Sequence, residues 1–171
     1  MRDSSTAPAP TVSIANGSVL TRALYVRDRF ALPSALDVPE LDPKVTSLPG
    51  GDVPVDAWDQ WWQTLLERDA NSSMPTPANP HLAELADVAD EDARRWEDEH
   101  VTWDPLYDAR WVSTWLIDHR LTTSVEVLVV GAGGVWHSQV SPARHLVSIG
   151  FYRAHDQMDA LLRQALEAQD A

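Results

Sequence analysis

Apolar side chains recur at helical spacing in several segments of the chain. From Trp58 to Leu66, three tryptophans and two leucines fall at i, i+3, i+4, i+7 and i+8, which predicts an amphipathic helix capped by Asp56. The same spacing predicts a closing helix over residues 156–169. Weaker apolar stripes, each introduced by an Asn-Pro or Asp-Pro start signal, predict helices over residues 80–100 and 105–120.

The segment 18–30 fits two structures. Leu20, Ala23 and Leu24 follow helical spacing after Ser18, a residue type that caps helices. The preceding Asn16-Gly17 pair is instead typical of a hairpin turn. We favour a helix that ends before Pro33.

After residue 121 the apolar pattern changes to a period of two. β-Branched residues alternate from Val125 onward and predict strands over 124–131, 134–140 and 145–153. Because the helices of the first two thirds are separated from these strands, the predicted fold class is α+β: helices packed on a short antiparallel sheet, with a C-terminal helix. Residues 1–13 are predicted to be a flexible tail, and residues 14–171 a single domain with an extended proline-rich loop at 33–55.

The stretch Gly131-Ala132-Gly133-Gly134 follows a run of valines, as a nucleotide-binding loop would. A dinucleotide fingerprint requires a third glycine where this chain has Trp136, and a helix should begin there. A Walker loop requires a Gly-Lys pair, whereas the only lysine is Lys44. We therefore predict a hairpin loop at these glycines and no cofactor.

Charge separates the chain into unequal parts. The net charge is −13, and residues 34–118 alone carry −14, against +2 for residues 1–33 and −1 for residues 119–171. An acidic surface repels nucleic-acid phosphates and anionic lipids and attracts basic proteins, although solubility alone also accounts for such a charge. The sequence predicts no nucleic-acid partner and no membrane partner. The absence of cysteine, of an apolar signal segment and of a long apolar run predicts a cytoplasmic location.

Candidate chemical motifs are incomplete. Glu97-x-x-His100 has the spacing of a carboxylate–histidine metal motif, but a bundle metal site needs a second copy, which the chain lacks. Ser138, Asp118 and either His119 or His145 supply the residue types of a hydrolytic triad, without the Gly-x-Ser-x-Gly turn that exposes a nucleophile. We predict no catalytic, cofactor-binding or metal-binding residues and favour a non-enzymatic protein.

Tryptophan is unusually frequent, with eight in 171 residues. The helical spacing of most of them favours core packing, whereas a partly exposed cluster would favour partner binding. Trp103 and Trp136 are the best candidates for exposure because they lie at predicted loop or strand edges.

These observations favour an acidic protein that binds a basic protein partner, for example an inhibitor or immunity-type protein. The predicted contact surface is the acidic segment near residues 84–104. Its residues are Asp90, Glu91, Asp92, Glu97, Asp98, Glu99, Trp103 and Asp104.

Two alternatives remain open. One is an enzyme or small-molecule-binding protein whose pocket lies between the Trp-rich helices and the sheet, under the loop 33–55. Its acid–base group would be His100, His119, His137 or His145. The other is a structural subunit of a larger assembly.

Overall fold

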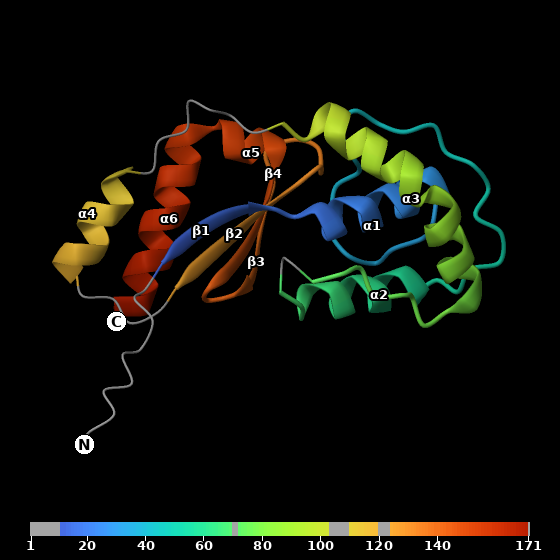
Figure 1. Ribbon diagram of the computed structural model, residues 1–171, viewed down its shortest axis with the longest axis horizontal. Helices are drawn as coiled ribbons and strands as arrows, with labels where there is room; N and C mark the ends of the chain where they lie inside the picture. Colours follow the sequence, from blue (N-terminus) through green and yellow to red (C-terminus); the bar gives the residue numbers. More distant parts are fainter. Residues whose placement is uncertain (1–10, 70–71, 103–109, 120–123, 171) are drawn as a thin grey trace, which may run out of the picture.

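The computed structural model describes residues 11–69, 72–102, 110–119 and 124–170. Figure 1 shows a central sheet with helices on both sides. The elements in chain order are β1 (Val12–Asn16), α1 (Ser18–Arg29), α2 (Ala57–Leu66), α3 (Pro80–His100), α4 (Arg110–His119), β2 (Val125–Val130), β3 (His137–Ser141), β4 (Arg144–Ser148), α5 (Ile149–Arg153) and α6 (His155–Asp170). No helix within the described ranges has both the length and the apolar character needed to cross a membrane.

The mixed helix-and-strand class and the C-terminal helix are confirmed, but the predicted sheet differs from the observed one. The sheet has four strands in the order β1-β2-β4-β3, and only β3 and β4 are antiparallel. β2 pairs in parallel with both β1 and β4, so the prediction of an antiparallel sheet was wrong for most of it. The extra strand begins at Val12, inside the predicted tail. Its partner lies more than 100 residues away, and no local pattern encodes such a pairing.

The predicted hairpin at the glycine stretch was also wrong. β2 and β3 are not neighbours, because residues 131–136 carry the chain past β4 to the far edge of the sheet. The stretch pairs instead with the proline-rich loop: Gly133 N–H donates to Glu40 O at 2.7 Å and Asp42 N–H donates to Gly131 O at 3.2 Å. At Gly134 the backbone adopts a φ of 69°, which glycine tolerates. Since no helix begins after these glycines, the chain also lacks the geometry of a dinucleotide loop.

Two other boundaries differ from the predicted strands. β3 begins at His137 instead of residue 134, and β4 ends at Ser148 instead of residue 153. The Ser148 hydroxyl accepts a hydrogen bond from Phe151 N–H at 3.1 Å and so caps α5, which occupies the end of the predicted strand. The predicted helix over residues 18–30 is confirmed as α1.

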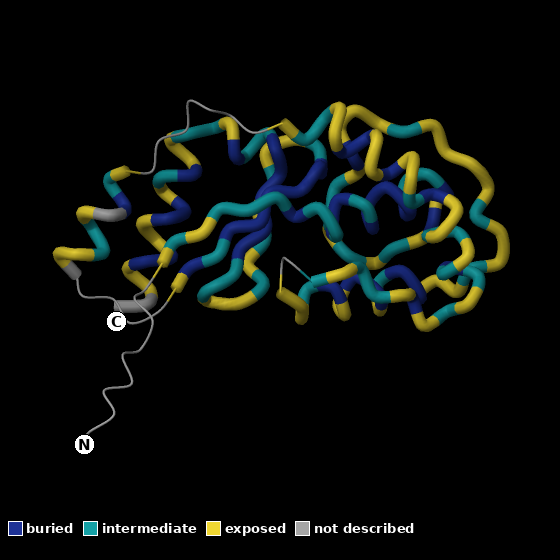
Figure 2. The backbone as a smooth tube through the Cα atoms, viewed as in Figure 1, coloured by how far each residue is buried: buried dark blue, intermediate teal, exposed yellow. Residues whose placement is uncertain are grey.

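Apolar residues pack on both faces of the sheet (Figure 2). Leu128, Val130 and Leu146 face α1, α2 and α3. Val125, Val127 and Val129 face the opposite way, toward α6, α5 and α4. β2 is therefore buried on both faces, which explains its nearly continuous run of valines.

Most of the described tryptophans belong to the core. Trp58, Trp61, Trp62 and Trp96 are buried. The indole N–H of Trp58 donates to Ala23 O at 2.9 Å, which satisfies its polar atom inside the core. Three others, Trp111, Trp115 and Trp136, are half-buried, and Trp103 lies outside the described residues.

The proline-rich loop 33–55 wraps the C-terminal end of α1. The buried Arg27 guanidinium donates to the carbonyls of Val38 and Pro39, at 2.8 Å each. The Asp28 carboxylate accepts from Leu41 N–H at 2.6 Å. Side chains at one helix end thus satisfy backbone groups of a loop whose prolines prevent regular structure.

Candidate functional site

Helix α3 divides the acidic segment into an inner and an outer face. Asn79 caps its first turn by accepting from Leu82 N–H at 2.9 Å. Leu82, Ala89 and Ala93 are buried on the inner face. With eight acids and two arginines, α3 carries a formal charge of −6, close to half of the net charge of the chain.

The outer face of α3 is exposed (Figure 2), and its acids are only partly neutralised by ion pairs. Its exposed acids are Glu84, Asp87, Glu91, Asp92, Asp98 and Glu99. Arg94 pairs with Asp90 at 2.7 Å, and Arg95 pairs with Glu91 and with Asp92 at 3.3 Å each. Exposed pairs of this kind contribute little to stability. Among the described residues, Asp87, Asp98 and Glu99 form no ion pair, so their charges remain available to a partner.

An apolar side chain lies in the middle of this acidic face. Val88 is 76% exposed, although the next residue, Ala89, lies on the buried face of α3. Glu84 and Glu91 lie about one helical turn before and after it on the same side. We call the set Glu84, Asp87, Val88, Glu91, Asp92, Asp98 and Glu99 the α3 face. An apolar centre surrounded by charged residues is the usual anatomy of a protein-binding surface.

The predicted contact residues differ in how far they are exposed. Glu91, Asp92, Asp98 and Glu99 are exposed on α3, and Asp90 is half-buried beside them. Trp103 and Asp104 lie outside the described residues.

Glu97 differs from its neighbours, because its side chain points inward and the residue is only 6% exposed. Its carboxylate accepts from Asn16 Nδ2 at 2.8 Å and from Ser18 Oγ at 2.7 Å, where β1 passes into α1. Arg22 Nε lies 3.9 Å away. The expectation that Glu97 forms part of an exposed surface was therefore wrong. Its position four residues after the buried Ala93 explains why it faces the core.

The structure does not assemble a metal site around the Glu97-x-x-His100 motif. His100 Nδ1 lies 2.7 Å from Trp96 O, and its ring stacks on the Trp96 indole at 4.9 Å between centroids. Glu97 is engaged on the opposite side by β1 and α1. Within the described ranges, no group of three or more histidine or acidic side chains could hold a metal ion.

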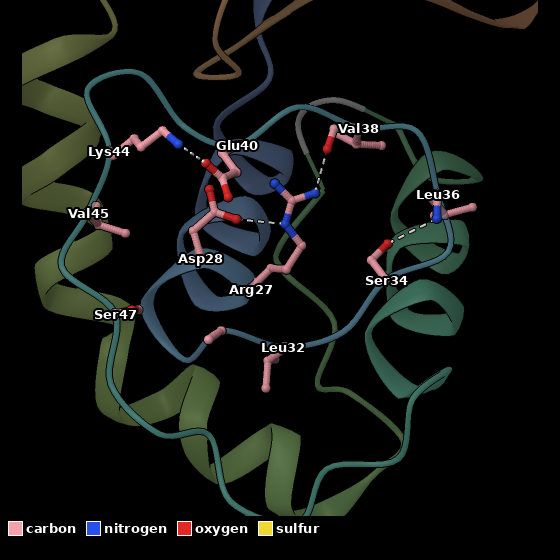
Figure 3. Close-up of a pocket in the computed structure, with 11 residues that line it drawn as sticks. Arg27, Asp28, Leu32, Ser34, Leu36, Val38, Glu40, Lys44, Val45 and Ser47 are labelled. Atoms are coloured by element: carbon pink, nitrogen blue, oxygen red, sulfur yellow. Dashed lines mark hydrogen bonds and ion pairs between the residues drawn. The ribbon is translucent and has the colours of Figure 1, made fainter.

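The proline-rich loop encloses a hollow of about 510 Å³ against α1 (Figure 3). Its charged residues neutralise each other: Arg27 pairs with Asp28 at 2.7 Å, and Lys44 pairs with Glu40. The hollow thus lies under the loop, as one hypothesis anticipated, but its lining includes no strand residue and no histidine.

His137 and His145, two of the predicted alternatives for an acid–base group, lie next to each other in the structure. Nε2 of His137 lies 3.1 Å from Nδ1 of His145 across the β3–β4 pair. The ring centroids are 5.4 Å apart and the ring planes lie 24° from parallel, and one of the two nitrogens can donate a hydrogen bond to the other. Burial lowers the pKa of both histidines, and for His137 the neighbouring His145 lowers it further.

The predicted triad components are not brought together. Ser138 pairs with Leu146 and therefore projects to the face opposite His145. Asp118 is exposed on α4, and the side chain of His119 is outside the described set. The register of β3 and β4 separates Ser138 from His145, because alternate residues of a strand face opposite sides of the sheet.

No protein-family model, curated protein or solved structure shows a significant match to this chain.

Proposed function

We propose that this chain is a non-enzymatic protein that binds a basic partner on the α3 face. The observation that supports it is the excess of exposed, incompletely paired acids around the exposed Val88. An inhibitor or immunity-type protein for a basic toxin is the concrete form we favour. Its carboxylates would occupy the surface where a nuclease binds phosphates.

The physical roles of the α3 face follow from its composition. Exposed carboxylates raise the association rate with a positively charged partner, and salt at 0.1 M ionic strength screens that attraction beyond about 10 Å. Burying Val88 in the contact would add apolar area at the centre, where water is most completely excluded. The −6 charge of α3 then accounts for fast, salt-sensitive binding, and Val88 for retention of the complex.

The test compares three forms of the full chain in pull-downs from its native host. The first form is wild type, and the second reverses two charges on the α3 face (Glu91→Arg with Asp98→Arg). The third is a control with the same change of net charge at Asp52 and Glu67, which are exposed elsewhere. We expect a basic protein to be retained by the wild type and the control, and to be released as the salt concentration rises.

The α3 double variant should fail to retain that same protein. Equal recovery by all three forms would show that binding does not use α3. Recovery of no protein by the wild type at low salt would overturn the proposed function.

A further inference from the structure

A groove runs along α3 beside the acidic face. It has a volume of about 560 Å³ and lies between the first half of α3 and the segment 73–77, which connects α2 to α3. Its apolar lining comes from Trp61, Met74, Ala83 and Ala86. The indole N–H of Trp61 donates to Pro75 O at 2.9 Å, and the ring, only 3% exposed, lies beneath the groove as its floor.

The charged residues of the groove are not equally available. Arg22 and Arg94 both contact the Asp90 carboxylate, at 3.3 and 2.7 Å. Arg22 also lies 3.9 Å from the buried Glu97. Asp87, by contrast, has no ion pair among the described residues. The unneutralised charge of the groove is therefore a single carboxylate beside an apolar lining.

The groove wall restricts how a ligand binds. Segment 73–77 contains Pro75 and Pro77, which have no N–H to donate, so a peptide cannot extend a regular strand ladder along it. Recognition must come from side chains that enter the groove. Met74 is half-buried and flexible, and such a side chain adapts to apolar groups of different shape.

We infer that the groove binds a segment of the basic partner in which an arginine or lysine lies next to a large apolar side chain. The cation pairs with Asp87, and the apolar side chain packs against Met74, Ala83 and Ala86, above the buried Trp61 ring. This inference rests on the proposed function and specifies the partner further: positive charge alone does not suffice. The partner then contacts two adjacent surfaces of α3, the α3 face and the groove, and Asp87 belongs to both.

The probes are two short synthetic peptides of equal charge, one alternating arginine with leucine and the other alternating arginine with glycine. Binding to the full chain is measured by fluorescence anisotropy. Ala86→Trp fills the groove without changing the charge, and Thr114→Trp on the exposed surface of α4 is the matched control. Asp87→Asn removes the unpaired carboxylate.

We expect the wild type and Thr114→Trp to bind the arginine–leucine peptide more tightly than the arginine–glycine peptide. Ala86→Trp should abolish that difference, and Asp87→Asn should weaken both peptides by about fivefold, the upper range for one exposed ion pair. Equal binding of the two peptides by the wild type, or an unchanged preference in Ala86→Trp, would overturn the inference.

Failure of the groove and failure of the proposed function are distinguishable. If Glu91→Arg with Asp98→Arg weakens peptide binding while Ala86→Trp does not, the α3 face binds a basic partner without the groove. Circular dichroism checks that Ala86→Trp folds. If it does not fold, methyl NMR of wild-type Met74 replaces it: the arginine–leucine peptide should shift that resonance, and an unshifted methyl group would contradict the inference.

Discussion

Glu97 provides the sharpest test of how α3 is held in place. The Glu97 carboxylate accepts two hydrogen bonds, from Asn16 and Ser18, and it is 6% exposed. A hydrogen bond to a charged group contributes about 1.5–3 kcal/mol. Glu97→Ala removes both acceptors and leaves two donors without partners, so we expect it to lower the free energy of unfolding by about 3–5 kcal/mol. Since small proteins have only about 5–15 kcal/mol in total, this change should be easy to measure.

Glu97→Gln separates the charge from the hydrogen bonds. The glutamine amide oxygen can still accept from Asn16, and the Ser18 hydroxyl can rotate to accept from the amide nitrogen. Only the charge assistance and the attraction to Arg22 are lost, so we expect a decrease of about 1–2 kcal/mol. Urea denaturation followed by tryptophan fluorescence measures both variants, with Asp98→Asn as the matched control on the exposed side of the same turn.

A double-mutant cycle identifies the interaction responsible. Ser18→Ala combined with Glu97→Ala should show a coupling energy of about 1–2 kcal/mol, as for residues in one hydrogen-bond network. Surface substitutions usually change stability by less than about 0.5 kcal/mol. A loss for Glu97→Ala no larger than that of Asp98→Asn would refute the assignment of Glu97 as the residue that fixes α3 to β1 and α1.

Three further substitutions test other features of the chain. Ala31 follows α1 with a φ of 47°, a left-handed conformation that costs a residue with a side chain about 1–2 kcal/mol, so Ala31→Gly should raise the urea midpoint. Because the pKa values of His137 and His145 are lowered in the folded state, the unfolded chain binds more protons below its histidine pKa of about 6.5. The contribution of the pair is therefore fully present above about pH 6.5 and decreases as the pH falls, and urea titrations should show a smaller decrease in His145→Phe. Asp98→Lys should stabilise the fold by about 0.3–1 kcal/mol because Asp98 lies in the last turn of α3, where the helix dipole disfavours negative charge; an unchanged or lower midpoint would contradict this.

The longer helices were predictable because each has a local apolar period that matches its buried face, whereas the five-residue α5 lies in a segment that was predicted as a strand. Trp58, Trp61 and Trp62 show this for α2, where all three are buried, as the core interpretation of their spacing expects. The parallel sheet was not predictable in the same way. Thr11 contacts Ser124 across 113 residues, and no spacing within either segment identifies the other as its partner.

The candidate site contained a usable signal that the charge pattern obscured. Ala89, Ala93 and Glu97 are four residues apart, so the buried stripe of α3 continues through an acid. The acids of α3 were predicted to form one surface, although they divide between an inner and an outer face of the helix. A carboxylate at core spacing indicates a buried, hydrogen-bonded group, whereas Asp98 and Glu99, which follow it in sequence, lie outside the stripe and are exposed.

The last turn of α3 argues against solubility as the sole reason for its acids. Lysine would suit this position better for stability, because the C-terminal end of a helix dipole favours positive charge. The chain instead places Asp98 and Glu99 there, exposed and without an ion pair among the described residues, and so accepts a small loss of stability. Surfaces that reduce stability in this way are typical of functional sites. If Asp98→Lys both stabilises the fold and abolishes retention of the basic partner, the same carboxylate will have been shown to oppose folding and to support binding.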